Sequence, residues 1–403
     1  MSAAPAPALA ARLRQIAPSA TGEMFRRVAE LKAQGVPLIS LAVGEPDFDP
    51  PASILEAARR ALEVGPYGYT QVAGLPALRS AICARSRARR GLEHTPDAVV
   101  VSAGAKHSLF QLAQVLLDPG DEVVIPTPSW VSYADQVRLC GAQPRFVPCA
   151  AADGFLPRPE ALAAAIGPRT KALILCSPNN PTGSAYDAAG LEALAEVLRA
   201  HNVWTILDEI YAELFYEGDA APSLLQVAPD LRERTVIVDG VSKSYAMTGF
   251  RVGWLLGPRE LAQACEKLQS QCTTSIATVA QLAALAALSG DQSCVSTMRD
   301  AYRQRRDLVL AGLAKIPGIV CQKPRGAFYV FADVRGLFGR GGAGRVLASD
   351  VDVAEWLLER ARVACVPGTA FGGPGYVRFS YAASTPDLTE AIERIEAAVA
   401  TLS

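Results

Sequence analysis

The sequence predicts an α/β protein in which a mainly parallel sheet is covered by helices and is followed by a smaller α+β unit. Between residues 98 and 241, short apolar runs alternate with segments of helical period, which is typical of parallel strands connected by helices. After Gly290 the alternation stops, and a long charged segment, two further strands and an amphipathic segment follow. The change of pattern indicates a second, smaller unit.

The expected elements follow in chain order. In the first part we expect strands at residues 98–102, 122–125, 171–176, 203–207 and 235–238, and helices at 109–117, 131–139 and 191–200. In the second part we expect a helix at 295–314, strands around 328–332 and 376–380, and a final helix at 387–402.

Charge and hydropathy argue against nucleic acids and membranes as binding partners. Lys plus Arg number 39 against 40 for Asp plus Glu, so neither a nucleic acid nor a membrane surface is an expected partner. The most apolar long stretch, residues 276–289, is too short to span a bilayer. The first twenty residues lack the apolar centre of a signal peptide. We therefore expect a small-molecule substrate and no membrane association.

The cysteines and histidines favour neither a disulfide framework nor a metal site. The nine cysteines include no C-x-x-C pair, and an odd number of scattered thiols is typical of the reducing cytoplasm. The three histidines are not at metal-ligand spacing from one another or from a cysteine. We expect a cytoplasmic protein without a metal ion.

Lys243 lies just after the strand expected at 235–238, in the segment Val241-Ser-Lys-Ser-Tyr-Ala-Met-Thr-Gly-Phe-Arg251. A partly desolvated lysine amine has a lowered pKa and acts as a nucleophile and proton carrier. The alternative is a surface lysine in a loop. Residues at the ends of the other strands favour the catalytic interpretation.

Two polar segments follow neighbouring strands. Asp208 and Tyr211 lie in Leu-Asp-Glu-Ile-Tyr, where a carboxylate and a phenol are within one turn of each other. The alternative for Asp208 is a helix N-cap. The segment Ser177-Pro-Asn-Asn-Pro-Thr-Gly183 is a stiff turn that can fix an asparagine amide as a donor, and its alternative is an ordinary Pro/Gly turn.

Further residues suit an anionic ligand with an aromatic ring. Small residues in Ser102-Ala-Gly-Ala-Lys106 let backbone N–H groups approach a phosphate at a helix N-terminus. Ser242 and Arg251 would add a hydroxyl and a guanidinium. Trp130 would stack on a ring, with a core aromatic as the alternative. Arg378 suits capture of a carboxylate, with a rim ion pair as the alternative.

Together these groups match the needs of pyridoxal phosphate (PLP). The cofactor requires a lysine amine for covalent attachment, an acid for the pyridine nitrogen, a donor for the phenolic oxygen and a cradle for the phosphate. Ligands of open α/β sheets bind outside the carboxyl ends of the strands, where separate loops converge. The sequence therefore predicts a PLP site at that edge.

The chain resembles the class I and II aminotransferases of PLP fold type I, from about Ser19 to Ser403. Within that group it is similar to the bacterial aspartate aminotransferases and prephenate aminotransferases. The segments that carry the resemblance are Leu41-Ala-Val-Gly-Glu-Pro-Asp-Phe48, Tyr67-Gly-Tyr-Thr70, Trp130-Val-Ser-Tyr133, the turn at residues 177–183, Asp208-Glu-Ile-Tyr211, residues 242–253 and Gly326-Ala-Phe-Tyr329.

The resemblance implies a seven-stranded, mainly parallel sheet in the large domain. It also implies three regions: an N-terminal arm with part of the small domain at residues 1–45, the large PLP-binding domain at 46–290 and the small C-terminal domain at 291–403. The family forms homodimers in which a tyrosine matching Tyr69 enters the site of the second subunit.

The resemblance also implies the role of each site residue. Lys243 would bond to the cofactor, Asp208 would pair with the pyridine nitrogen, and Asn180 and Tyr211 would hold the phenolic oxygen. Trp130 would stack on the ring. The expected phosphate ligands are Gly104, Ala105, Ser242, Arg251 and the partner's Tyr69, with Lys106 also beside the cofactor. The expected substrate ligands are Gly44, Lys106, Trp130, Asn180 and Arg378. Ala105 stands where glycine is common in the branch.

The implied reaction moves an amino group between an amino acid and a 2-oxo acid in two half-reactions. A lysine matching Lys106 contacts the distal carboxylate of dicarboxylic substrates, which favours aspartate, glutamate or prephenate. The alternative is a PLP-dependent lyase, synthase or cyclase on the same scaffold.

Overall fold

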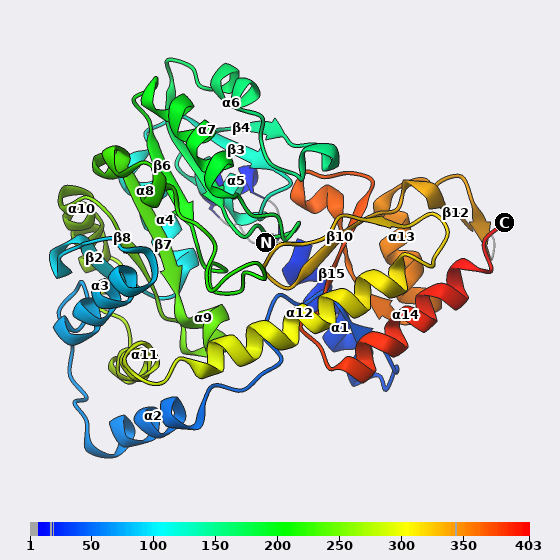
Figure 1. Cartoon of the computed structure of the whole chain (residues 1–403), viewed down its shortest axis with the longest axis horizontal. Coiled ribbons are helices and arrows are strands. Elements are labelled where there is room, and N and C mark those ends of the chain that lie inside the picture. Colours follow the sequence, from blue (N-terminus) through cyan, green and yellow to red (C-terminus); the bar gives the residue numbers. More distant parts are fainter. Residues whose placement is uncertain (1–6, 17, 19, 343–344) are drawn as a thin grey trace, which may run out of the picture.

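Two sheets organise the chain in a computed structural model (Figure 1). The residues described are 7–16, 18, 20–342 and 345–403. The large sheet has seven strands in the order β2-β8-β7-β6-β5-β3-β4, and the small sheet has the order β14-β15-β10-β9. The seven strands of the large sheet are β2 (Val99–Ser102), β3 (Glu122–Thr127), β4 (Gln143–Pro148), β5 (Thr170–Cys176), β6 (Trp204–Asp208), β7 (Thr235–Gly240) and β8 (Gly253–Leu256).

The large sheet is mainly parallel, as predicted. Strands β3 to β7 pair in parallel with one another, whereas β8 is antiparallel to both of its neighbours, β2 and β7. The five strands expected from the sequence are present with ends shifted by two residues at most. Strands β4 and β8 were not predicted. Because β8 is antiparallel to both β2 and β7, those two strands run in the same direction. The carboxyl end of β2 therefore lies at the same edge of the sheet as the carboxyl ends of the parallel strands.

Helices surround the large sheet (Figure 1). They are α2 (Ala52–Val64), α3 (Pro76–Arg90), α4 (Ala105–Leu116), α5 (Ser132–Leu139), α6 (Pro159–Ala165), α7 (Ala188–Arg199), α8 (Leu224–Val227), α9 (Val241–Ser244), α10 (Arg259–Ser270) and α11 (Thr278–Ser289). The apolar stretch noted at residues 276–289 contains α11, which packs against α2 and α3. Within the described part of the chain, no helix is both long and apolar enough to cross a bilayer.

The small sheet gathers the C-terminal third of the chain. Its region contains β9 (Val320–Cys321), β10 (Tyr329–Asp333), β11 (Gly341–Gly342), β12 (Arg345–Val346), β13 (Val363–Ala364), β14 (Val366–Pro367), β15 (Tyr376–Ser380), α12 (Ser293–Leu313), α13 (Asp350–Trp356) and α14 (Thr385–Val399). The N-terminal segment joins it, because β1 (Ile39–Ser40) pairs in parallel with β13, and α1 (Ala20–Ala33) contacts β14. Helix α12 runs beside both regions (Figure 1).

Strand β5 shows how one apolar run supplies two cores. Leu173 and Leu175 belong to the cluster on one face of the large sheet, and Ala172 and Ile174 belong to the cluster on the other. Side chains alternate between the faces of a strand, so a strand covered on both sides is apolar throughout. The sequence Thr170–Cys176 therefore specifies a central, doubly covered strand.

Because Leu173 is fully buried in β5, Leu173→Ala should lower the free energy of unfolding by about 2–5 kcal/mol through lost burial and a residual cavity. Urea unfolding of the apoprotein measures the change. The control is Val320→Ala on the edge strand β9, which is 65% exposed and should alter stability by about 0.5 kcal/mol or less. Equal effects of the two substitutions would contradict this assignment of the core.

Candidate active site

One pocket lies where the carboxyl ends of the parallel strands meet. The loops after β2, β3, β5, β6 and β7 all contribute to its wall, together with residues from the N-terminal segment and the small sheet. Eleven residues predicted from the sequence line it, namely Gly44, Ala105, Lys106, Trp130, Asn180, Asp208, Tyr211, Ser242, Lys243, Arg251 and Arg378. The strand directions thus bring distant segments of the sequence to one place.

Lys243 projects into this pocket from the short helix α9. Its Nζ atom donates a hydrogen bond to the backbone carbonyl of Gly44 at 2.8 Å. Burial lowers the pKa of the Lys243 amine to about 8, with Glu45 acting against the shift. The alternative of an ordinary surface lysine is therefore wrong, because the amine lines the pocket and is easier to deprotonate than a solvated one.

Asp208 ends β6 and is buried beneath the pocket. The Tyr133 hydroxyl donates to its Oδ2 at 2.6 Å, and the Ile210 N–H donates to its Oδ1 at 3.3 Å. Burial raises the pKa of the carboxyl to about 6, while the Tyr133 bond opposes the rise. Asp208 does not cap a helix, since the next helix, α8, begins at Leu224. The carboxylate is thus fixed and poised to pair with a cationic group.

Two tyrosines also line the pocket. The hydroxyl groups of Tyr211 and Tyr329 lie 2.8 Å apart in a hydrogen bond, and both side chains are buried. Burial raises the pKa of the Tyr211 phenol well above its ordinary value. Tyr211 therefore stays protonated and can donate a hydrogen bond to an oxyanion.

The amino end of α4 also reaches the pocket, where Ala105 and Arg251 line it. Gly104 precedes the helix with φ of 86°, and a Cβ atom there would lie 2.6 Å from Nη2 of Arg251. A Cβ atom on Gly253 would lie 2.3 Å from the Ala105 nitrogen. The two glycines allow β8 and Arg251 to approach the start of the helix, where backbone N–H groups and the helix dipole favour an anion.

Arg378 reaches the pocket from β15 in the small sheet. It donates from Nη1 to Asn180 Oδ1 at 2.9 Å and from Nη2 to the Ala42 carbonyl at 2.6 Å. The Tyr329 and Phe371 rings flank the guanidinium, with their centroids 4.5 and 4.9 Å from its carbon atom. Since the side chain is only 2% exposed, the alternative of a rim ion pair is wrong. The arginine is a fixed cation suited to a carboxylate.

Lys106 adds a further cation. Its Nζ atom lies 4.8 Å from the centroid of the Trp130 ring, and the Trp130 ring meets that of Tyr133 edge-on. Burial and the neighbouring Arg251 lower the pKa of the Lys106 amine. Trp130 is therefore a pocket residue and not only a core aromatic.

Two of the predicted site residues do not line the pocket. Gly104 adjoins the pocket through Arg251, whereas the Tyr69 side chain is 92% exposed on a single chain. Among the pocket residues that were not predicted from the sequence are Glu45, Tyr133, Cys176 and Tyr329. Tyr133 and Tyr329 belong to segments that carry the family resemblance. Their position in those segments is the one feature of the sequence that could have indicated a role in the site.

The family model for aminotransferase class I and II matches residues 36–395. The chain belongs to this family. It is 47% identical to the aspartate aminotransferase of Geobacillus stearothermophilus over 387 residues, which cover 96% of this chain and 98% of that protein. It is 45% identical to the aspartate/prephenate aminotransferase of Thermus thermophilus over 390 residues, which cover 96% and 97%.

Solved structures agree with this assignment. The crystal structure of the aspartate aminotransferase from Rhizobium meliloti has a TM-score of 0.95 at 42% identity, covering 99% of this chain and 100% of that one. The aspartate aminotransferase from Thermus thermophilus with maleate has a TM-score of 0.91 at 44% identity, covering 98% and 100%. The predicted PLP fold type I and aminotransferase activity are confirmed, in preference to a lyase, synthase or cyclase.

The aminotransferase depends on PLP, and the pocket fits that cofactor. Lys243 offers a buried amine with a pKa of about 8, and Asp208 offers a buried carboxylate. The glycine-lined start of α4, together with Ser242 and Arg251, would hold a phosphate. When bound, PLP supplies an electron sink that stabilises a carbanion beside nitrogen.

The lowered pKa of Lys243 predicts the pH dependence of stability in the apoprotein. Between pH 8 and 10.5 the unfolded chain keeps a proton that the folded amine has lost, so stability rises with pH in this window. Lys243→Met removes the cost of burying the ammonium. Its thermal midpoint should exceed that of the wild type below pH 8, and the difference should shrink between pH 8 and 10.5.

Thermal unfolding of both apoproteins across this pH range checks the prediction. Lys171→Met, at an exposed position on β5, is the matched control and should retain the pH dependence of the wild type. A difference between wild type and Lys243→Met that stays constant with pH would contradict the lowered pKa.

Proposed function

We propose that this aminotransferase acts on aspartate or glutamate as amino donor and on a 2-oxo acid as acceptor, in two half-reactions of a ping-pong cycle. One observation carries the proposal: the pocket contains both Arg378 and Lys106 in addition to Arg251. With Arg251 assigned to the phosphate, two cations remain for the two carboxylates of a dicarboxylic substrate. The names of the relatives and the maleate complex of the Thermus thermophilus protein support this substrate class.

The catalytic roles in this proposal belong to Lys243, Asp208 and Tyr211. Lys243 carries the cofactor and takes the α-proton of the bound amino acid, for which its pKa of about 8 is suited near neutral pH. Asp208 faces the pyridine nitrogen, where burial and the Tyr133 bond hold it in one orientation. Tyr211 and Asn180 donate to the phenolic oxygen of the cofactor.

Binding residues complete the proposed site. Trp130 stacks on the cofactor ring, and the phosphate is held at the start of α4 by Gly104, Ala105, Ser242 and Arg251, with Lys106 beside it. The α-carboxylate of the substrate binds Arg378, Asn180 and the backbone of Gly44. The bond from Arg378 to Asn180 at 2.9 Å supports a shared carboxylate site, because it holds both side chains in place.

We also propose a homodimer in which Tyr69 enters the partner's site. Helix α2 and the loop after it expose Leu62, Val64, Tyr67 and Tyr69, which supports a covered surface in the assembled enzyme. The proposed domains are residues 1–45, 46–290 and 291–403, with Arg378 supplied by the small domain. The nine free cysteines support a cytoplasmic location.

If Lys106 binds the distal carboxylate, Lys106→Met should raise KM for aspartate and glutamate by about 10- to 100-fold, which corresponds to the loss of one hydrogen bond to a charged group. The amine form of the cofactor, followed by absorbance while individual amino acids are added to the holoenzyme, reports each first half-reaction. Conversion by alanine should change little.

The control for this prediction is Lys171→Met, which removes an exposed lysine and should leave both substrates unaffected. Wild-type enzyme that is converted by aromatic or cationic amino acids but not by aspartate or glutamate would contradict the role of Lys106.

If Tyr69 acts across a dimer interface, two inactive variants should complement each other. A mixed dimer of Lys243→Ala and Tyr69→Ala chains contains one site with both defects and one intact site, so it should regain about half of the wild-type activity. Differently tagged chains, purified as mixed dimers, allow the measurement. Failure to regain activity in mixed dimers, or a monomer in sedimentation, would contradict the shared site.

A further inference from the structure

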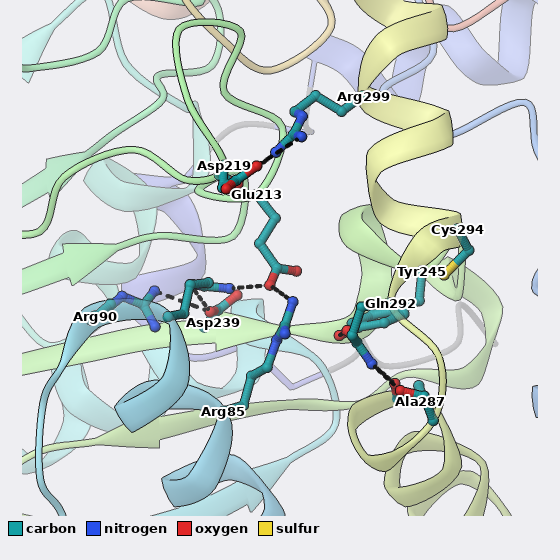
Figure 2. A network of polar contacts seen from close by, with 12 residues as sticks. Arg85, Arg90, Glu213, Asp219, Asp239, Tyr245, Ala287, Gln292, Cys294 and Arg299 are labelled. Carbon is teal, nitrogen blue, oxygen red and sulfur yellow. Dashed lines mark hydrogen bonds and ion pairs between the residues drawn. The ribbon is translucent and has the colours of Figure 1, made fainter.

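Behind the pocket, α3 meets the large sheet through a buried ionic cluster that consists of Arg85, Arg89, Arg90, Glu209, Glu213 and Asp239. Figure 2 shows Arg85 and Arg90 on α3 beside Glu213 and Asp239. Arg89 bonds to Glu213 and to Asp239, each at 2.9 Å. Arg85 also pairs with Glu213. The three cations and three carboxylates of the cluster balance one another.

Arg90 pairs with the two carboxylates of the cluster that come from residues beside Asp208. It pairs with Glu209 and lies 3.3 Å from Asp239. The side chains of Arg90, Glu209 and Asp239 are 4, 6 and 5% exposed. Water therefore screens these charges weakly, and an unpaired member would exert a strong field.

The carboxylates of Glu209 and Asp239 come from residues beside Asp208 at the ends of β6 and β7. Glu209 follows Asp208 in the chain, and its N–H donates to the Val238 carbonyl at 2.9 Å. Asp208 pairs across β6 and β7 with Val238, the residue before Asp239. The pKa of Asp208 is raised to about 6, mainly by burial, and the charges of Asp239 and Glu209 contribute to this rise. The arginines of α3 thus neutralise the charges that lie behind the cofactor-facing carboxylate.

We propose that the arginines of α3, and Arg90 in particular, balance the charge behind Asp208 and so keep the proton of the pair on the pyridine nitrogen of the cofactor. Arg90 is a positioning residue in this scheme, because it acts through Asp208 and does not line the pocket. The inference rests on the role proposed above for Asp208. It goes beyond that role by assigning a function to side chains on a helix outside the site.

The physical argument is electrostatic. A proton shared by a ring nitrogen and a carboxylate is drawn toward added negative charge. Glu209 and Asp239 lie on the side of Asp208, so leaving one of them unpaired moves the proton from the nitrogen to Asp208. The other groups near Asp208 are Tyr133 on α5, Cys176 on β5 and Lys243 on α9, and all three are retained in the variants described below.

The test follows the ring nitrogen directly by ¹⁵N NMR of holoenzyme reconstituted with ¹⁵N-labelled PLP across a range of pH. In Arg90→Met, the ¹⁵N signal at neutral pH should move toward that of the unprotonated ring, because one uncompensated charge at this depth shifts the equilibrium between the nitrogen and Asp208 by roughly tenfold toward Asp208. Arg90→Lys keeps the charge and should resemble the wild type.

Charge compensation separates this role from a structural one. The double variant R90M/E209Q removes one charge of each sign and should restore the wild-type ring signal, although it leaves more of the cluster disrupted. Glu209→Gln alone should shift this equilibrium the other way, toward the protonated nitrogen, which keeps the inference testable if Arg90→Met does not fold. The matched control is Arg306→Met, a buried arginine on α12 that pairs with Asp307, which should lower the thermal midpoint without moving the ring signal.

Three outcomes overturn the inference in distinguishable ways. If Asp208→Asn changes the ring signal while Arg90→Met and Glu209→Gln do not, Asp208 keeps its proposed role and the α3 arginines have no part in it. If Asp208→Asn also leaves the signal unchanged, the proposed role of Asp208 fails together with the inference. A double variant that departs further from the wild type than Arg90→Met would show that the cluster acts only as structure.

Discussion

The parallel direction of β2, β3, β5, β6 and β7 brings the carboxyl ends of all five strands to one edge of the large sheet. Residues from each following loop line the same pocket, although Ala105 and Lys243 are 138 positions apart in the sequence. Parallel strands impose this meeting, because each must be entered from the same side. The antiparallel β8 preserves the arrangement by separating β2 from β7 without reversing either.

Burial then determines the chemistry of the groups collected there. Low solvation lowers the pKa of the Lys243 amine and raises the pKa of the Asp208 carboxyl, so both move toward neutrality. Each is held by one short hydrogen bond, from Lys243 to the Gly44 carbonyl and from Tyr133 to Asp208. The small sheet contributes Arg378, whose bond to Asn180 ties the two sheets together across the pocket. A cation, a carboxylate and an anion site are thereby maintained within one cavity.

Much of the site could be predicted because the sequence features that indicate it lie within short segments. Lys243, Asp208 and the turn containing Asn180 each follow a short apolar strand, and such strand ends are visible in the sequence. The nearly continuous apolar run in β5 likewise indicates a strand covered on both faces. The roles of Tyr133 and Tyr329 were not predicted, since an aromatic residue in a short segment has no local feature that distinguishes a hydrogen-bond donor from a packing residue.

The sequence by itself determined the α/β class, the strand ends that carry the site and the membership of the aminotransferase family, because these depend on periodicity and short motifs. Only the tertiary structure decided that β8 is antiparallel and that α3, a helix rich in arginine, faces the interior. Arg89 and Arg90 are buried because their carboxylate partners come from β7 and from the segment that follows β6, more than a hundred residues away. Ion pairs between residues that are distant in the sequence cannot be inferred from a local sequence pattern, because only the folded chain brings the two partners together.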